Sequence, residues 1–277
     1  MEIGVFSRTY ETRDPAETFR HMTAQGIRRA QWNYINAGLP TMPETVTEED
    51  LAGIRGEVQA FGVQLDAVTG TFNMIDPDAE EKERGLTQFA LHCRIARELG
   101  IPVITLCTGS KSPESKWKWH EDNEKDSSFS ELLASTERIL RYAEENDIIL
   151  GVEPESGNII NTSLRARQYL DVFQSPHLKI VMDGANLFIP EKVPDMTKIL
   201  TEAFDVLGGD LCLAHAKDFT LDGSIRYTAP GKGILDFALY GKLLRQTGYE
   251  GALIMHGLSE EEVPAAKAFL EGVLRSE

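Results

Sequence analysis

The sequence has few cysteines and no long apolar run. Its three cysteines, Cys93, Cys107 and Cys212, are odd in number and far apart, and no C-x-x-C occurs. This usage is typical of a reducing compartment and argues against a disulfide-stapled secreted scaffold. No uninterrupted apolar run approaches the roughly 18 residues of a membrane span, and the N-terminus lacks a basic stretch followed by an apolar one. We therefore expect a soluble cytoplasmic protein with no membrane partner.

Basic residues are also scarce. The chain has 28 lysines and arginines against 44 aspartates and glutamates, a formal net charge of −16. Binding to nucleic acid depends on clustered cations that neutralise phosphates, so we expect no nucleic-acid partner. A basic pocket for a small anion stays compatible with this composition.

Short apolar runs alternate with longer helical patterns, and eight such units fill the 277 residues. Parallel strands covered by helices on both faces are continuously apolar, as these runs are. Eight units in this length are typical of an α/β fold of the (β/α)8 TIM barrel type. The alternative is an open doubly wound sheet, but no G-x-G-x-x-G follows the first run. We expect one barrel domain over residues 1–277, with strands at 3–7, 27–32, 63–70, 101–109, 148–154, 178–183, 211–218 and 252–256.

Helix signals lie between these runs. D-P-A-E at 14–17 combines an aspartate cap, proline at the first helical position and glutamate three residues after the cap. T-E-E-D at 47–50 is a similar start. The segments 76–100, 130–146 and 259–275 have amphipathic helical patterns.

Ionisable residues stand at the ends of four consecutive predicted strands. These residues are Glu153, Asp183, His215 and His256. In a TIM barrel the strand ends meet at one mouth, where two buried carboxylates repel each other unless a proton or a cation lies between them. Two carboxylates and two imidazoles suit Mn²⁺ or Zn²⁺, with Mg²⁺, Co²⁺ or Fe²⁺ as alternatives. We predict that the four residues bind a divalent metal ion; a salt-bridged network of His215 with its neighbours in H-A-K-D is the alternative.

Other polar residues near the predicted mouth are candidates for the substrate. Asn186 follows Asp183 by three residues and could reach the ion or a hydroxyl group, or only cap a turn. Asn73 follows the third strand. Lys217 and Arg226 are candidates for a carboxylate or phosphate, although both could equally be surface cations.

The insert at 109–128 is polar, contains two tryptophans and directly follows the fourth strand. We interpret it as a lid or wall over the mouth, in which Trp119 stacks on the substrate and His120 moves a proton. A solvent-exposed loop with an incidental histidine is the alternative.

The motifs G-V-E-P-E (151–155), D-x-x-N (183–186) and H-x-K-D (215–218) resemble those of the xylose isomerase-like barrel superfamily, over nearly the whole chain. That superfamily contains sugar phosphate isomerases and epimerases, and AP endonucleases of the same fold. The resemblance implies a metal held by Glu153, Asp183, His215 and the strand-eight residue. Here that residue is His256, where the family commonly has glutamate, and Asn186 stands where the family often has histidine.

We therefore expect a metal-dependent isomerase or epimerase that moves a proton next to the carbonyl group of a sugar, a sugar phosphate or a keto-polyol. Glu153 is the first candidate for the base, and Glu155 is the second. Family epimerases use opposed carboxylates from strands five and eight, so His256 favours isomerisation with one base. The alternatives are a metal-dependent hydrolase, including a nuclease, a dehydratase, and a binding protein without turnover. The sequence leaves open whether the chain forms a homo-oligomer.

Overall fold

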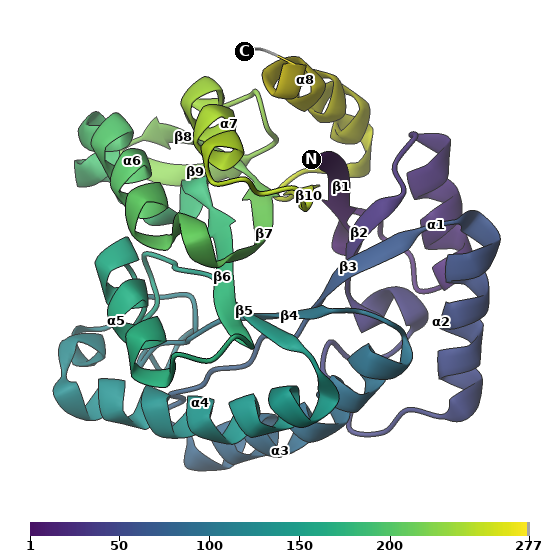
Figure 1. Ribbon diagram of the computed structural model, residues 1–277, viewed down its shortest axis with the longest axis horizontal. Helices are drawn as coiled ribbons and strands as arrows, with labels where there is room; N and C mark the ends of the chain where they lie inside the picture. Colours follow the sequence, from purple (N-terminus) through teal and green to yellow (C-terminus); the bar gives the residue numbers. More distant parts are fainter. Residues whose placement is uncertain (276–277) are drawn as a thin grey trace.

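In the computed structural model, which describes residues 1–275, parallel strands close into a barrel at the centre of the molecule (Figure 1). The last of them along the chain, β10, pairs with β1 and with β7, which closes the ring. The predicted (β/α)8 barrel is confirmed. In ring order the strands are β1 (Glu2–Phe6), β10 (Ala252–Met255), β7 (Leu211–Ala216), β6 (Leu178–Asp183), β5 (Ile149–Val152), β4 (Val103–Leu106), β3 (Gln64–Thr69) and β2 (Arg29–Trp32).

The α-helices form an outer ring around these strands (Figure 1). Two begin as predicted: the side chain of Asp14 accepts from the backbone N–H of Glu17, and Thr47 and Asp50 form a reciprocal capping box. Such side chains satisfy N–H groups that have no partner within the helix. The helices are α1 (Pro15–Ala24), α2 (Glu48–Phe61), α3 (Ala79–Glu98), α4 (Asp126–Asn146), α5 (Ser163–Phe173), α6 (Met196–Leu207), α7 (Phe237–Gln246) and α8 (Val263–Arg275).

The core has two parts. A large cluster packs between the strands and the helices, and a smaller one fills the inside of the barrel. Because the inside is packed, a ligand has room only at the mouth, where the strands end. The inner cluster consists of Ala67, Val103, Val181, Leu213, Ala252 and Ile254.

The predicted strand 211–218 is too long. Strand β7 ends at Ala216, and the chain then forms an antiparallel hairpin of β8 (Asp218–Asp222) and β9 (Ser224–Thr228) outside the barrel. Asp222–Gly223 between alternating apolar residues is a hairpin signal that the sequence contains. Gly223 has a φ of +66°, a left-handed conformation that glycine adopts without strain.

Helix boundaries also differ from the prediction. Helix α4 begins at Asp126 rather than 130, and the predicted helix 259–275 is divided into a 3₁₀ turn at Glu260–Glu262 and helix α8. Within residues 1–275, none of the helices combines the length and the apolar character needed to cross a membrane.

We predict a pH-dependent contribution to stability from His92, a fully buried residue of α3 packed against the rings of Tyr34 and Phe89. Burial lowers its pKa to about 4. Below its unfolded pKa of about 6.5, the unfolded chain binds a proton that the folded chain does not, so acid favours unfolding. The free energy of unfolding should lose about 2 kcal/mol from this residue between pH 7 and pH 5.

Urea denaturation of the wild type and of His92→Leu at both pH values measures this loss. The variant should lose about 2 kcal/mol less than the wild type on acidification. An equal loss in both proteins would show that His92 does not carry the effect.

Candidate functional site

Three of the four predicted metal ligands lie together at the mouth of the barrel. One ligand atom from each of Glu153, Asp183 and His215 lies within 4.8 Å of the other two. His215 Nδ1 is 3.2 Å from Glu153 Oε1 and 3.7 Å from Asp183 Oδ2. The residues come together because β5, β6 and β7 are neighbours, and their register places Asp183 directly beside His215.

Gln31 of β2 holds His215 from the opposite wall. Its Nε2 lies within hydrogen-bond distance of the hydroxyl groups of Thr69 and Thr105, so its Oε1 accepts from His215 Nε2 at 2.7 Å. A hydrogen on Nε2 leaves Nδ1 to face the two carboxylates, which is how an outer hydrogen bond orients a metal-binding histidine. Sequence analysis did not single out Gln31; its signal was a polar residue near the end of a predicted strand.

Opposite charges dominate the electrostatics of this group. Burial alone would raise the pKa of Asp183, but the ammonium of Lys217 and the ring of His215 hold it below its usual range. Burial likewise opposes the charge on His215, while Glu153 and Asp183 raise its pKa to about 9. Two cationic side chains therefore balance the two carboxylates when no other cation is present.

Glu155 lies close to this group, but its pKa is shifted in the opposite direction to that of Asp183. Burial and then the charge of Glu153 raise the pKa of Glu155 well above its usual range, with Lys217 opposing. Two carboxyl groups in contrasting environments are a common arrangement where one accepts and the other delivers a proton.

His256 lies beside His215 but is not part of the three-residue group. Its ring stacks on His215, with centroids 5.3 Å apart, and on Phe6 at 4.8 Å. Its Nδ1 is buried without a hydrogen-bond partner among the described residues. A role of His256 as the fourth ligand stays a prediction.

The three grouped residues fit a divalent ion. Asp183 Oδ1 accepts from the backbone N–H of Ala185, whereas the buried Oδ2 faces the side chains of Lys217 and His215, with Nζ 3.0 Å and Nδ1 3.7 Å away. A buried carboxylate oxygen is costly unless a cation lies close to it, and a divalent ion could take that place between the three residues. Two carboxylates and an imidazole are ligands that Mn²⁺ and Zn²⁺ accept.

Asn186 and Lys217 complete the network. Asn186 Nδ2 donates to Glu153 Oε1 at 2.6 Å, and Lys217 Nζ donates to Asn186 Oδ1 at 2.5 Å. Lys217 Nζ also lies 3.0 Å from Asp183 Oδ2. Both residues contact the candidate ligands, and Lys217 pairs with Asp183 rather than with its neighbours in H-A-K-D.

Asp218, the last residue of H-x-K-D, is turned away from that network. Its carboxylate accepts from the backbone N–H groups of Phe219, Gly231, Gly233 and Leu235 at 2.8 to 3.0 Å. It therefore organises the turn at 230–233, whose sequence is P-G-K-G, and occupies the backbone amides of both glycines of that turn. A Cβ at Gly233 would lie 2.3 Å from Asp218 Oδ1, so only glycine fits there.

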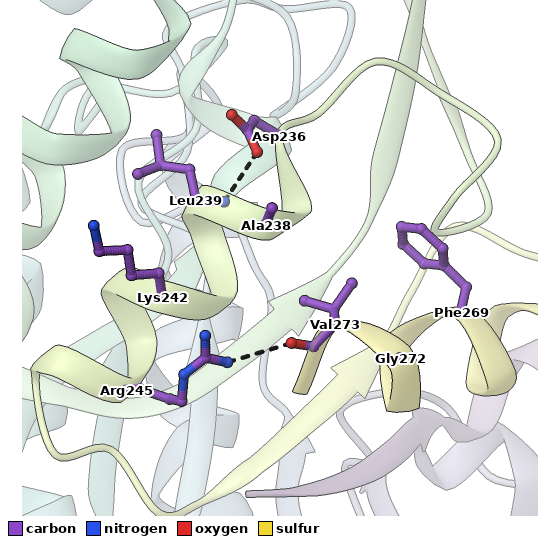
Figure 2. A pocket seen from close by; sticks show the side chains of 8 residues that line it. All are labelled: Asp236, Ala238, Leu239, Lys242, Arg245, Phe269, Gly272 and Val273. Carbon is purple, nitrogen blue, oxygen red and sulfur yellow. Dashed lines mark hydrogen bonds between the residues drawn. The ribbon is translucent and has the colours of Figure 1, made fainter. Parts of the chain in front are cut away.

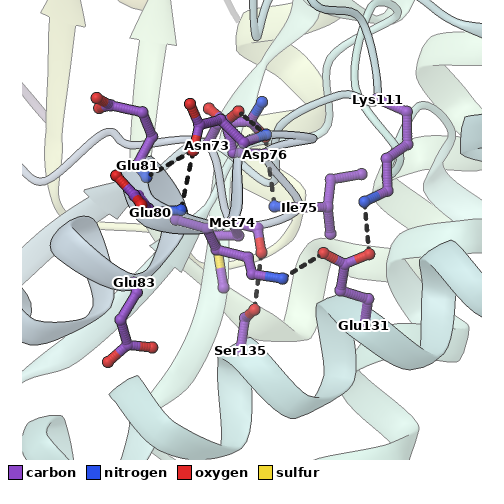
Figure 3. A network of polar contacts seen from close by, with 12 residues as sticks. Asn73, Met74, Ile75, Asp76, Glu80, Glu81, Glu83, Lys111, Glu131 and Ser135 are labelled. Carbon is purple, nitrogen blue, oxygen red and sulfur yellow. Dashed lines mark hydrogen bonds and ion pairs between the residues drawn. The ribbon is translucent and has the colours of Figure 1, made fainter.

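The loop after β3 and the insert after β4 are tied together. Asn73 donates to the carbonyl of Ser110 at 2.8 Å and accepts from the N–H of the same residue at 3.1 Å. Lys111 Nζ pairs with Glu131 of α4 at 2.5 Å, as Figure 3 shows. The amide of Asn73 is thus engaged with the backbone, and its binding of substrate stays a prediction.

Trp119, His120 and Arg226 lie in exposed or partly exposed segments. Trp119 is 48% exposed, and His120 caps a short 3₁₀ turn by accepting from the N–H of Asp122. Arg226 is exposed on β9. No contact of these three with the ligand group is found within residues 1–275, and their roles stay predictions.

Two grooves differ in their relation to the mouth. One of about 680 Å³ opens beside His256, between the segments that follow β1 and β10, and is lined by Arg8 and Glu11, which sequence analysis did not single out. The other, of about 590 Å³, lies between α7 and α8 on the outer ring (Figure 2). Only the first adjoins a strand-end residue of the candidate site.

The sequence pattern of the xylose isomerase-like TIM barrel family matches residues 27–275. The chain belongs to this family. A D-psicose 3-epimerase of Enterocloster bolteae is 27% identical over 215 residues, which are 76% of this chain and 66% of that protein. The match thus spans a little under two thirds of the relative's length.

Solved structures share the fold of this xylose isomerase-like TIM barrel. A D-psicose 3-epimerase from Clostridium cellulolyticum H10, solved with D-tagatose, superposes with a TM-score of 0.76 at 15% identity, covering 100% of both chains. A 3-keto-D-glucoside 4-epimerase from E. coli has a TM-score of 0.75 at 18% identity, covering 98% of this chain and 99% of that one. The resemblance read from the three sequence motifs is therefore confirmed at the level of family and fold.

Proposed function

We propose that this chain isomerises or epimerises a sugar by moving a proton at a carbon next to a carbonyl group, with a divalent metal ion held by Glu153, Asp183 and His215. The observation that carries the proposal is the group of these three side chains, with one ligand atom of each within 4.8 Å of the others and with His215 Nδ1 facing the carboxylates. The similarity to a D-psicose 3-epimerase supports a sugar as the substrate.

Each residue of the group has a task in this proposal. An ion at these residues would polarise the carbonyl group and acidify the neighbouring C–H. Glu153 removes that proton, and the Asn186 amide, 2.6 Å from Oε1, holds its carboxylate in place. Glu155 is the second candidate for proton transfer because it is a carboxyl group close to Glu153.

The strand-eight residue bears on the type of reaction. Where the family has a second carboxylate, this chain has His256, whose ring stacks on His215 and borders the groove of about 680 Å³. This arrangement favours a single base that shuttles the proton, which suits isomerisation. The epimerases among the similar proteins favour the alternative, in which a second group acts on the other face.

Solvent-deuterium exchange tests the proposal. Protein loaded with Mn²⁺ and metal-free protein are incubated in D₂O with ketoses, ketose phosphates and keto-polyols, and products and deuterium are followed by NMR. Only the loaded protein should form product, and a one-base shuttle should retain part of the substrate's hydrogen. If no substrate exchanges hydrogen or forms product, the isomerase proposal fails and the hydrolase alternative is tested next.

A further inference from the structure

Lys217 places a positive charge inside the candidate metal site. Its side chain is 7% exposed, and Nζ lies 3.0 Å from Asp183 Oδ2, the oxygen that would face an ion. The same nitrogen donates to Asn186 Oδ1 at 2.5 Å. An ammonium group therefore already neutralises a carboxylate that the ion would need.

The site has few negative charges, so the position of the Lys217 ammonium affects how tightly a metal ion can bind. Glu153 and Asp183 are the two carboxylates of the three-residue group, and the strand-eight position holds His256 instead of a third carboxylate. Asn186 links Lys217 to Glu153, because its amide contacts both. A divalent ion close to Oδ2 would therefore be repelled at short range by the ammonium, with few negative charges to compensate.

Tyr227 is a further partner of the ammonium in the position where it pairs with Asp183. Lys217 Nζ lies 4.1 Å from the centroid of the Tyr227 ring, which comes from the hairpin strand β9 and is 49% exposed. A cation over the face of a tyrosine is attracted by the ring. The four-carbon stem of lysine has enough rotatable bonds to move Nζ away from Asp183 while it keeps this contact.

We propose that Lys217 is an internal competitor for the metal site, and that a divalent ion binds when the ammonium leaves Asp183 Oδ2 and stays on the Tyr227 ring. This inference rests on the proposed metal site but not on the identity of the reaction. Lys217 thus lowers metal affinity, and the hairpin takes part in metal binding although it supplies no ligand.

Isothermal titration of the metal-free protein with Mn²⁺, without any sugar, tests the inference. Lys217→Met and Lys217→Gln should each bind Mn²⁺ about tenfold more tightly than the wild type, because a nearby like charge has been removed. Tyr227→Leu should bind about threefold more weakly, because the ring counts for more once the ammonium has left Asp183 and has lost that charged partner. The matched control is Lys232→Met, which removes an exposed lysine paired with Glu262 and should leave the affinity unchanged.

Thermal melting first checks that each variant is folded. If either folded Lys217 variant binds Mn²⁺ as weakly as the wild type or more weakly, the inference is overturned. If Lys232→Met tightens binding as much as the Lys217 variants do, the effect is one of net charge and the inference also fails. Turnover is measured separately. Tighter Mn²⁺ binding by the Lys217 variants without any sugar reaction supports the inference and refutes the proposed function. A sugar reaction without tighter Mn²⁺ binding by these variants supports the proposed function and refutes the inference.

Discussion

Asp183→Asn is expected to strip the divalent ion from the protein and to lower kcat/KM by at least about 10³-fold. Asn Oδ1 still accepts from the N–H of Ala185, which keeps the turn after β6. The second carboxylate oxygen becomes an NH₂ group, which cannot bind a cation. The variant removes one of three ligands that lie within 4.8 Å of each other, so the site should not hold an ion.

Elemental analysis of the purified variant, together with its turnover of the identified sugar, measures both effects. Asp205→Asn on the exposed face of α6 is the matched control and should retain the wild-type metal content. The Lys217 ammonium faces the new amide, so a melting curve must show that the variant is folded. Stoichiometric metal in the folded Asp183 variant would refute the assignment of this ligand.

Glu153→Gln should abolish exchange of the substrate hydrogen with solvent and lower kcat by about 10²- to 10⁴-fold. Glutamine has nearly the same shape as glutamate but cannot take up the proton. Because Glu153 is also a candidate ligand, the result is interpreted at saturating Mn²⁺, with the bound metal measured in the same sample. The glutamine oxygen can still accept from Asn186 Nδ2 in place of Glu153 Oε1, so the hydrogen bond that positions this side chain is retained.

Glu155→Gln is the matched comparison, because it makes the same chemical change two residues away. If Glu153 is the base, Glu155→Gln should retain hydrogen exchange while Glu153→Gln loses it. A metal-loaded Glu153→Gln protein that exchanges hydrogen at the wild-type rate would transfer the role of base to Glu155 or to another group.

The barrel could be predicted because its strands carry their own signal. Eight apolar runs separated by helices are what a parallel barrel requires, and each predicted run contains an observed barrel strand or most of one. The positions of Glu153, Asp183 and His215 also followed from the sequence, since the ends of consecutive parallel strands must meet at one mouth. That neighbourhood depends on topology alone and needs no knowledge of side-chain packing.

The hairpin was missed for a different reason. The last residues of the predicted strand 211–218 belong to a connection and to β8, and continuous apolar character does not mark the residue at which a strand leaves the barrel. The D-G pair at 222–223 was present but was hidden by the neighbouring strand signal.

The orientation of side chains around the mouth depended on contacts between residues distant in the chain. Gln31 reaches His215 across the barrel, and His256 is held in a stack between Phe6 and His215. Asp218 turns to four backbone amides, whereas Lys217 beside it turns to Asp183. The sequence alone specifies at the end of which strand a residue lies. The partner that the end of its side chain contacts is set by packing and by charge, after the eight strands have formed the closed barrel.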